Sequence, residues 1–335
     1  METLKQNIAQ ITINGKNVTA DVAPYLSRLN YTDRVEAESD DITLTFEDTE
    51  GHWQNGWYPQ QGDTLTVTIG TYGNPLDCGL FEIDEIEFDF PPDTVTIKAI
   101  GASISKAMRT RNSKAFEKQT LKQIAQFFAT KHDLRLIGNT SELQKIEIER
   151  KTQDRQTDLA FLSGLAKEYG IVFSVRGDQL IFIDIDDLEK QPSVLTIHKN
   201  ELSKARFTDK TSQIFGAAVV STRNMKSNQV HRWKVTPPKG KGTDALTDDT
   251  WKGDITVENE TQAQAKAKGE LKDKNKDKIT GSITVEGNVK LVAGINIELA
   301  GIGEFSGKWH VVSSSHSIDN SGGYTTDASI RKIKE

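Results

Sequence analysis

Alternation of apolar and polar residues with a period of two, interrupted by glycine, constrains this chain more than any other feature. In residues 291–329 one alternating run begins after Gly294, a second covers 308–318, and a third follows the polar turn at 319–323. Such runs, separated by glycine and polar turns, are typical of antiparallel strands with one buried face. The sequence therefore predicts a small antiparallel sheet at this end of the chain.

The same pattern occurs near the other end of the chain, after Gly62. From Gly62 to Val95 is 33 positions, and from Gly294 to Thr326 is 32. Two small β modules of one design in one chain explain this match. A second explanation stays open, because any two antiparallel sheets with strands of similar length share such spacing.

Composition indicates a folded, rather polar protein of two or three domains. The chain has 335 residues, of which 36% are hydrophobic and 27% are charged. Its 42 basic and 48 acidic side chains give a net charge of −6, with no dominant basic stripe. We therefore expect no specific nucleic-acid binding.

Cysteine usage and hydropathy exclude further classes. The single cysteine, Cys78, excludes an internal disulfide and a cysteine-based zinc cluster, and its context predicts a loop beside a strand. The first residues carry no apolar signal region, and no segment approaches the roughly 18 apolar residues of a membrane span. We expect no membrane association and synthesis in a cytoplasm.

Residues 8–100 are predicted to be all β. Asn14-Gly15 is a strong signal for a short hairpin loop. The turn-rich loop at 50–59 carries Trp53 and Trp57, whose burial would stabilise it by roughly 1.5–3 kcal/mol per ring. A loop that covers its own barrel is the preferred interpretation, and a platform that stacks on a ligand is the alternative.

Around residue 101 the period changes to that of helices. Thr120 and Thr157 are each followed by apolar residues at helical spacing, so each is predicted to cap a helix, and Gly170 is predicted to end the second one. Residues 176–178, Arg-Gly-Asp, lie between two apolar runs and are interpreted as a hairpin turn rather than an adhesion signal. An α+β domain is therefore expected, with an exit linker at 186–192.

Strands are expected again from Val194. The segments 215–221 and 230–235 are candidate strands, and 234–250 is polar and irregular, which indicates a long mobile loop. A helix capped by Asn259 is predicted to follow, with an apolar face formed by Ala263, Ala267 and Leu271. The lysine-rich run at 266–278 is interpreted as the solvated surface of that helix.

No motif in the sequence indicates catalysis. A nucleophile elbow, a phosphate-binding glycine loop and a zinc-protease helix are all absent. Two histidines, His310 and His316, have an even spacing that would place them on one face of a strand, but the nearby sequence offers no carboxylate to complete a metal site. We nominate no catalytic, cofactor-binding or metal-binding residue. The histidines are His52, His132, His198, His231, His310 and His316, and the acidic pairs considered are Asp40-Asp41, Asp84-Glu85 and Asp186-Asp187.

A β-rich chain with two similar modules and no active site matches the expectation for a structural ring component. Open sheets expose unpaired edges, which copies arranged about an axis can satisfy. If each chain carries two similar modules, three chains make a ring of six modules.

Several segments, in this order along the chain, resemble one known family. The chain resembles the phage late control protein D family of tail hub proteins and, more distantly, the N-terminal hub half of type VI secretion spike proteins. The resemblance covers nearly the whole chain, and the order of the matches is more specific than any one of them. The matching segments are 13–21, 31–33, 38–41, 57–63, 158–162, 169–182, 294, 305–307, 311–316 and 323–326.

The resemblance implies a mainly β fold with an α+β middle domain. Two tail-tube-like antiparallel β-barrels would flank a small helix-hairpin domain. The expected domains are a first barrel at 1–101, the α+β domain at 102–192, and a second barrel at 193–335 with a loop-helix insertion at about 236–277.

The resemblance also implies a function. The protein would be a structural baseplate hub of a contractile phage tail or phage-tail-like particle, not an enzyme, assembled in a bacterial cytoplasm. A homotrimer would form a pseudo-sixfold ring that joins the sixfold tail tube to the threefold spike around an axial channel. Expected partners are a separate spike protein, the tube or its initiator, the tape-measure protein and baseplate wedge proteins, without a cofactor. A peptidoglycan-degrading tail enzyme and a glycan-binding module are the alternatives.

Overall fold

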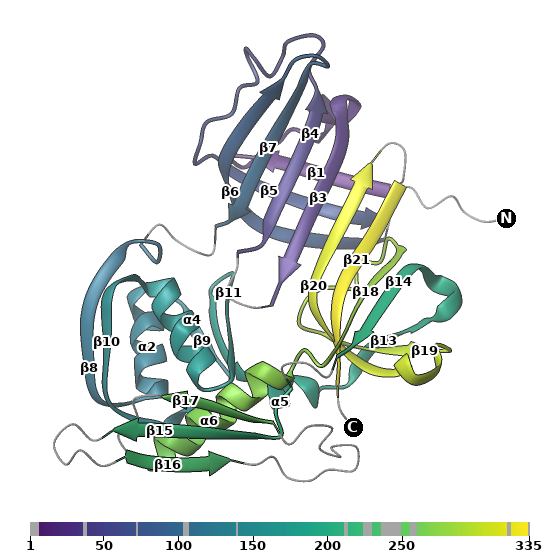
Figure 1. The fold of residues 1–335 in the computed structure, drawn as a ribbon. Helices are drawn as coiled ribbons and strands as arrows, with labels where there is room; N and C mark the ends of the chain where they lie inside the picture. Colours follow the sequence, from purple (N-terminus) through teal and green to yellow (C-terminus); the bar gives the residue numbers. More distant parts are fainter. Residues whose placement is uncertain are drawn as a thin grey trace. The chain divides into compact units, whose positions relative to one another are not determined.

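The computed structural model describes residues 7–35, 39–71, 73–102, 107–138, 140–210, 214–223, 230–235, 249–254, 260–319 and 323–333. The chain forms two compact units (Figure 1). Unit 1 contains Met1–Ile104, Gln191–Arg206 and Gly281–Glu335, and unit 2 contains Ser105–Lys190 and Phe207–Thr280. The chain therefore crosses from one unit to the other four times.

Unit 1 is built on one 13-stranded sheet. Short helical turns, α1 (Thr19–Val22), η1 (Ala23–Tyr25), η2 (Lys199–Glu201) and η3 (Gly303–Phe305), connect some of its strands. The strands are β1 (Asn7–Ile13), β2 (Lys16–Asn17), β3 (Leu26–Arg34), β4 (Asp41–Glu47), β5 (Thr64–Thr71), β6 (Asn74–Asp89), β7 (Thr94–Gly101), β13 (Ser193–His198), β14 (Leu202–Asp209), β18 (Ile279–Glu286), β19 (Asn296–Ala300), β20 (Gly307–Asp319) and β21 (Gly323–Lys332).

The two halves of this sheet have the same strand order. The N-terminal module, β1–β7, runs β3-β4-β7-β6-β5-β1 in space, with β2 beyond β1. The C-terminal module, which consists of β13, β14 and β18–β21, runs β14-β18-β21-β20-β19-β13. Taken in chain order, each strand of the N-terminal module except β2 has a counterpart in the C-terminal module. One pairing differs in direction, because β1 is antiparallel to β5 whereas β13 is parallel to β19.

An extra residue interrupts the corresponding strands β6 and β20 at the same place. The register of β6 against β7 shifts between Ile83 and Glu85, and that of β20 against β21 shifts between Val311 and Ser313. Beside each bulge, a glycine N–H donates to the strand: Gly62 to the carbonyl of Ile83 at 2.8 Å, and Gly294 to that of Val311 at 2.9 Å. Both glycines have a φ of +89°, which glycine adopts without the steric cost of a side chain.

The strands β3 and β14 correspond in sequence as well. Residues 26–34 are Leu-Ser-Arg-Leu-Asn-Tyr-Thr-Asp-Arg, and residues 202–210 are Leu-Ser-Lys-Ala-Arg-Phe-Thr-Asp-Lys. Leucine, serine, threonine and aspartate recur in place, and two basic positions and one aromatic position are also kept. Each strand starts directly after a 3-10 turn, η1 or η2. This repeat gives the residue-by-residue correspondence between the first long strands of the two modules.

The core of the N-terminal module comes from strict alternation in its strands. In β4, for example, Ile42, Leu44 and Phe46 are fully buried while the residues between them face outward. The predicted hairpin at Asn14-Gly15 is confirmed, since Ile13 pairs with Lys16 across it. Cys78 is buried within β6, so its expected place in a loop was wrong; burial raises the pKa of its thiol.

Unit 2 is an α+β unit that also contains residues beyond 207. It has a two-stranded sheet β10-β8 and two three-stranded sheets, β11-β12-β9 and β16-β15-β17. Its elements are β8 (Arg111–Thr120), α2 (Leu121–Lys131), β9 (Arg135–Ile137), α3 (Thr140–Lys145), β10 (Glu147–Thr157), α4 (Asp158–Glu168), β11 (Ile171–Arg176), β12 (Gln179–Asp184), α5 (Ile185–Glu189), β15 (Ala217–Arg223), β16 (Val230–Val235), β17 (Thr250–Asp254) and α6 (Glu260–Asn275).

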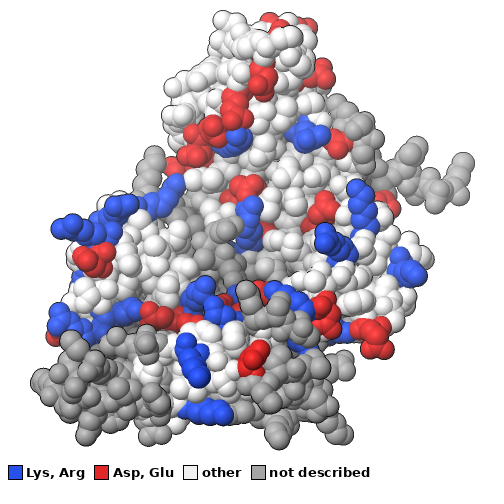
Figure 2. Space-filling model, viewed as in Figure 1, with Lys and Arg blue, Asp and Glu red and all other residues white. Residues whose placement is uncertain are grey.

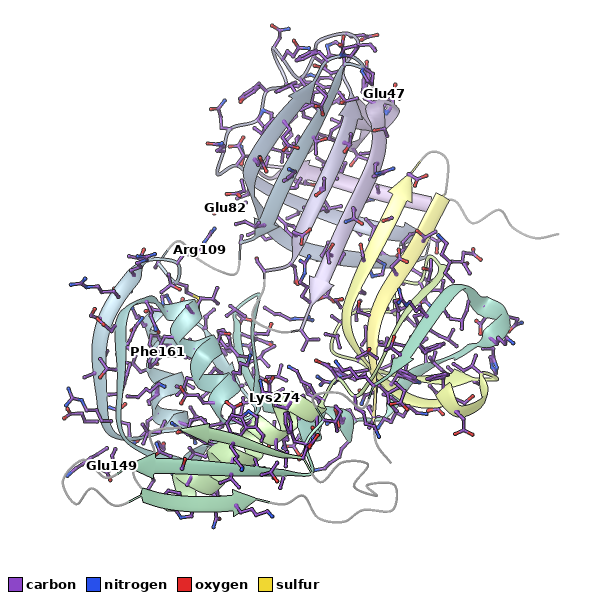
Figure 3. The ribbon with its side chains drawn as sticks, viewed as in Figure 1. Glu47, Glu82, Arg109, Glu149, Phe161 and Lys274 are labelled. Carbon is purple, nitrogen blue, oxygen red and sulfur yellow. The ribbon has the colours of Figure 1, made fainter. Side chains whose placement is uncertain are left out.

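Predicted local signals in unit 2 are confirmed. Thr120 forms a capping box at the start of α2, and the side chain of Thr157 accepts a hydrogen bond from the N–H of Ala160 at the start of α4. The Arg-Gly-Asp segment forms the turn between β11 and β12. Phe161 of α4, labelled in Figure 3, stacks on Phe116 at 5.6 Å between ring centroids.

The segment 207–280 departs from expectation. The strands predicted at 215–221 and 230–235 form β15 and β16, which pair with β17 in a sheet of unit 2, so they are not part of the 13-stranded sheet. Alternation predicted the strands correctly, but it does not specify which sheet a strand joins. Residues 236–248 of the loop expected at 234–250 and the cap at Asn259 lie outside the described residues. The boundaries of the three expected domains stay a prediction.

Helix α6 is more buried than its lysine-rich sequence indicates. The predicted apolar face is confirmed, because Ala263, Ala267 and Leu271 are buried. The interpretation of the lysines as a solvated surface was wrong for Lys266, which is 7% exposed and lies 3.2 Å from the carboxylate of Glu168. Because small residues let other elements approach this helix from several sides, a lysine can lie at the contact when a carboxylate pairs with it.

Candidate functional site

The two modules of unit 1 are joined edge to edge by β3 and β20, and this joint is the candidate functional site. Seven residue pairs form the antiparallel ladder, from Ser313 opposite Arg34 to Asp319 opposite Arg28. On one face of the ladder, the side-chain oxygen of Asn30 accepts hydrogen bonds of 2.8 Å from the hydroxyls of both Ser315 and Ser317. Backbone and side chains therefore connect strands that lie almost 300 residues apart in sequence.

The other face of the joint is buried. His316 is fully buried, stacks on Tyr31 of β3 at 6.0 Å and 20° between ring planes, and hydrogen-bonds the hydroxyl of Tyr324 at 2.9 Å through Nδ1. Burial lowers the pKa of His316 to about 4, so its ring is neutral at neutral pH. Asp33, 3% exposed, accepts a 2.9 Å hydrogen bond from the N–H of Ala293 in the C-terminal module.

The two histidines on β20 do not form a metal site. The bulge between Val311 and Ser313 reverses the alternation, so His310 and His316 lie on opposite faces of the strand despite their even spacing. His310 bonds Asn296 through Nδ1, and burial with the nearby Arg331 lowers its pKa to about 3. Among the described residues, no group of three or more histidine, cysteine or acidic side chains has the arrangement of a metal site.

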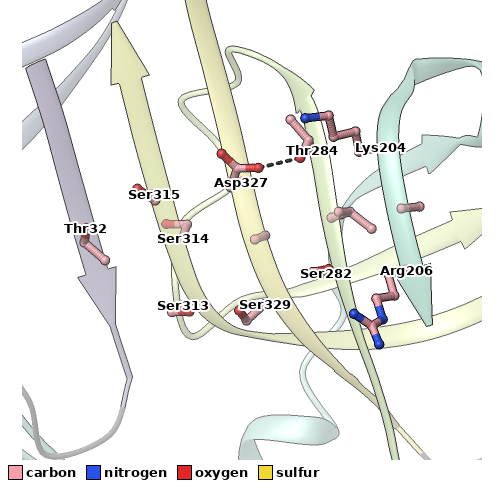
Figure 4. A pocket seen from close by; sticks show the side chains of 13 residues that line it. Thr32, Lys204, Arg206, Ser282, Thr284, Ser313, Ser314, Ser315, Asp327 and Ser329 are labelled. Carbon is pink, nitrogen blue, oxygen red and sulfur yellow. Dashed lines mark hydrogen bonds between the residues drawn. The ribbon is translucent and has the colours of Figure 1, made fainter. Parts of the chain in front are cut away.

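A polar face of the sheet crosses the joint. Hydroxyls dominate a hollow of about 320 Å³ on this face, formed by β14, β18, β21, β20 and β3 (Figure 4). Lys204 and Arg206 on β14 lie at one side, and Asp327 on β21 bonds the hydroxyl of Thr284. Its hydroxyl residues are Thr32, Ser282, Thr284, Ser313, Ser315 and Ser329 (Figure 4), whereas the hydroxyl of Ser314, which also borders the hollow, is buried. The hollow is therefore lined mainly by small hydroxyl side chains, and Lys204, Arg206 and Asp327 are its charged residues.

Charge changes along this face from basic to acidic. Lys204 and Arg206 lie on the first strand of the C-terminal module, and the last strand of the polar face, β6, carries Glu85, Glu87 and Asp89. Lys98 on β7 pairs with Glu85 at 3.1 Å and Glu87 at 2.7 Å. Figure 2 shows the acidic side chains gathered along the β6 side of the N-terminal module.

The loop with the two tryptophans covers its own module, as preferred from the sequence. Trp53 is 2% exposed and stacks on Phe46 at 4.5 Å, and Trp57 packs edge-on against Trp53 at 5.7 Å. A glycan platform that uses the face of Trp53 is therefore excluded by burial. The acidic pairs do not converge on a cleft either: Asp41 pairs with Arg34, and Asp186 pairs with Lys272 at 2.6 Å.

The most completely buried carboxylate lies in unit 2 and connects four segments. Asp158, 0% exposed, accepts from Lys131 at 2.5 Å and contacts His132 at 2.8 Å, and its other oxygen accepts from Gln153 and Asn112. Burial raises the pKa of this carboxyl, but the hydrogen bonds from Gln153, Lys131 and His132 outweigh it and hold the pKa below its usual value. These partners make Asp158 a structural anchor of α4.

Sequence reasoning missed the repeat that defines the joint. The nine-residue match between β3 and β14 is present in the sequence, but the glycine spacing indicates only the later strands of each module.

In the described part of the chain, no helix is long and apolar enough to cross a membrane.

Comparisons with known proteins agree with the fold. The probable baseplate hub protein of Escherichia phage 186 is 25% identical over 244 residues, which is 70% of this chain and 62% of that relative's length. The 43 kDa tail protein of prophage MuSo2 from Shewanella oneidensis has a similar fold, with a TM-score of 0.72 and 17% identity over 97% of this chain and 98% of that one.

A more distant likeness in fold reaches the type VI secretion system. The c3393 protein of Escherichia coli, a component of that system, matches with a TM-score of 0.58 and 12% identity over 93% of this chain and 74% of that one. The family model described as phage tail baseplate hub (GPD) matches residues 91–322, more than half of the chain. The chain therefore belongs to the phage tail baseplate hub family.

Proposed function

We propose that the protein is the structural hub of a tail baseplate and that three copies form a ring with pseudo-sixfold symmetry. The observation that carries this proposal is the repeated strand order of the two modules, joined edge to edge through β3 and β20. A chain with two similar modules presents six similar surfaces when three copies surround an axis. Such a ring matches a sixfold tube on one side and a threefold spike on the other.

The polar face supports a channel function for the ring. In the proposed arrangement each module is a tail-tube-like barrel, and the hydroxyl-rich face of the sheet lines the central passage. Side chains such as Ser313, Ser315 and Thr32 are small and uncharged, so they would hold a passing polyanion or protein only weakly. The ring is a passage and a joint, and its role is mechanical rather than enzymatic.

The partners and the location follow from this role. A spike protein would bind one side of the ring, and the tube or its initiator would bind the other. The tape-measure protein and the baseplate wedge proteins would contact the hub during assembly in the bacterial host cytoplasm. The finished protein would be part of a virion or a phage-tail-like particle.

The test is the symmetry of the assembled particle. The protein, alone and mixed with the spike protein of the same particle, is examined by light scattering and by electron microscopy of negatively stained particles. We expect a trimer with a central hole and six similar densities around it. A protein that stays monomeric at high concentration even with the spike protein present would overturn the proposal.

A further inference from the structure

The two corresponding strands β6 and β20 differ in how much of one side is paired: β20 is paired along both halves of that side, and β6 along only the first half. Strand β20 pairs with β19 through residues 307–310 and with β3 through residues 313–319. Its counterpart β6 pairs with β5 through residues 74–82, but no described strand pairs with residues 84–89 on the side away from β7. The C-terminal half of β6 is therefore an open edge where β20 has a partner.

Strand β14, which corresponds to β3, is also an edge strand. Strand β3 fills the second half of β20, and the strand that corresponds to β3 is β14, which ends the path of the 13-stranded sheet. Within one copy, six strands of the sheet separate β14 from β6. We propose that β14 of one copy pairs with residues 84–89 of β6 in the next copy, in the register in which β3 pairs with β20. This inference rests on the proposed ring of copies.

The matching bulges determine which residue of β6 corresponds to which residue of β20, and so they determine the register of the proposed pairing. Ile83 corresponds to Val311, so residues 85–89 of β6 correspond to 313–317 of β20. Residues 202–210 correspond to 26–34 through the sequence repeat. Transferring the β3–β20 pairs places Arg206 opposite Asp89, Phe207 opposite Phe88 and Lys210 opposite Glu85 of the next copy.

Three of the five transferred pairs are complementary, and the positions in β6 were assigned from the bulge without use of their chemistry. Two of them join opposite charges and one joins aromatic rings, the combinations that stabilise neighbouring strands. Within one copy, the equivalent of Arg206 is Asn30, whose oxygen lies between Ser315 and Ser317. At the contact between copies, Arg206 takes that place between Glu87 and Asp89.

Exposed aromatic rings beside the open edge support the same contact. Tyr58, Phe88 and Phe90 form a parallel stack with centroid distances of 6.1 and 6.4 Å, and Tyr58 and Phe90 are 48% and 58% exposed. In the C-terminal module the counterpart of Phe88 is His316, which is fully buried beneath Tyr31. In the C-terminal module, Tyr31 of β3 covers His316, but no residue of β3 covers the aromatic stack. In the proposed contact, Phe207 of the next copy corresponds to Tyr31 and would cover Phe88.

A cysteine pair tests the register directly. Thr208 is placed opposite Glu87, so Thr208→Cys with Glu87→Cys in the full-length chain brings two α-carbons within about 4.5–5.5 Å, the range of a disulfide. The control pair, Thr208→Cys with Glu85→Cys, is displaced by two residues, roughly 7 Å along the strand. The native Cys78 is buried and gives little background.

After mild oxidation of the assembled protein, non-reducing electrophoresis should show covalent dimers and trimers for the first pair and several-fold less for the control. Arg206→Glu should shift the protein toward monomer, and adding Asp89→Arg should restore the trimer. A wild-type trimer in which the first pair does not cross-link, or cross-links no better than the control, overturns this contact and leaves the proposed hub intact. Cross-linked open chains without closed rings would support the contact and overturn the ring.

Discussion

His310 and His316 show how single residues in unit 1 depend on burial. Both rings are buried in strand β20: Nδ1 of His310 bonds Asn296, and Nδ1 of His316 is within hydrogen-bond distance of the hydroxyls of Tyr324 and Thr326. A protonated imidazole would lose its hydration there without a carboxylate to replace it. The fold therefore accepts these residues only in their neutral form.

This predicts a loss of stability in mild acid. Because burial lowers the pKa of His316 to about 4 and that of His310 to about 3, both contribute fully above the unfolded value of about 6.5, and the contribution is lost as pH falls toward 4. Each histidine should cost about 1.4 kcal/mol of unfolding free energy per pH unit. Urea unfolding at several pH values between 7.5 and 5 measures this slope.

The variant His316→Gln should reduce the slope by the share of one histidine. The substitution removes the titrating group while an amide can still bond Tyr324. If the wild type and the variant lose stability in parallel over this range, another group causes the effect.

Strands β3 and β14 show the same element in two settings. Asp33 in β3 is buried and accepts from the N–H of Ala293, whereas its counterpart Asp209 in β14 is exposed. The side chain is the same, but only Asp33 lies against a strand of the neighbouring module. The pair therefore isolates the contribution of the joint between modules from that of the strand.

Substitution of each aspartate should separate the two settings. Asp33→Ala leaves the buried N–H of Ala293 without its acceptor and should lower the unfolding free energy of the monomer by about 1–3 kcal/mol. Asp209→Ala should change it by less than about 0.5 kcal/mol, as for other exposed positions. Denaturation at low protein concentration measures both, and equal losses would contradict the correspondence.

Much of this element structure was predictable, for physical reasons. Caps at Thr120 and Thr157 and the turn at Asn14-Gly15 depend on neighbours in sequence, so local patterns specify them. The joint of β3 with β20 depends on pairing across almost 300 residues, which no local pattern encodes. Strand β15 was expected in the second barrel but lies in a sheet of unit 2. The reason is the same: alternation defines which face of a strand is buried, but it does not define the partner strand.

At the scale of the whole molecule, unit 2 is closed by a contact between helices from two distant segments. Gly269 of α6 lies against the end of α4, where an added Cβ would be 2.6 Å from the backbone of Tyr169 and 2.7 Å from that of Gly170. No side chain can move aside to relieve a clash with backbone atoms. The approach of segment 207–280 to segment 105–190 therefore requires glycine at 269.

A change at this contact should affect one unit and not the other. Gly269→Ala should destabilise unit 2 by about 1–3 kcal/mol despite the higher helix propensity of alanine. In scanning calorimetry we expect two transitions, of which only one shifts to lower temperature. The control Gly164→Ala, in α4 with open space around it, should not lower either transition. A single transition that moves as a whole would show that the two units unfold together.

The edge strand β3 has a consequence for how the protein is made. The N-terminal module leaves the ribosome early, yet the strand that pairs with β3 is β20, whose residues 313–319 are synthesised long after β3. During that interval each nascent chain displays an uncovered strand beside neighbours on the same messenger RNA. An exchange of β20 between nascent chains would produce domain-swapped dimers. Slow translation after residue 190 should therefore lower the yield of correctly folded protein.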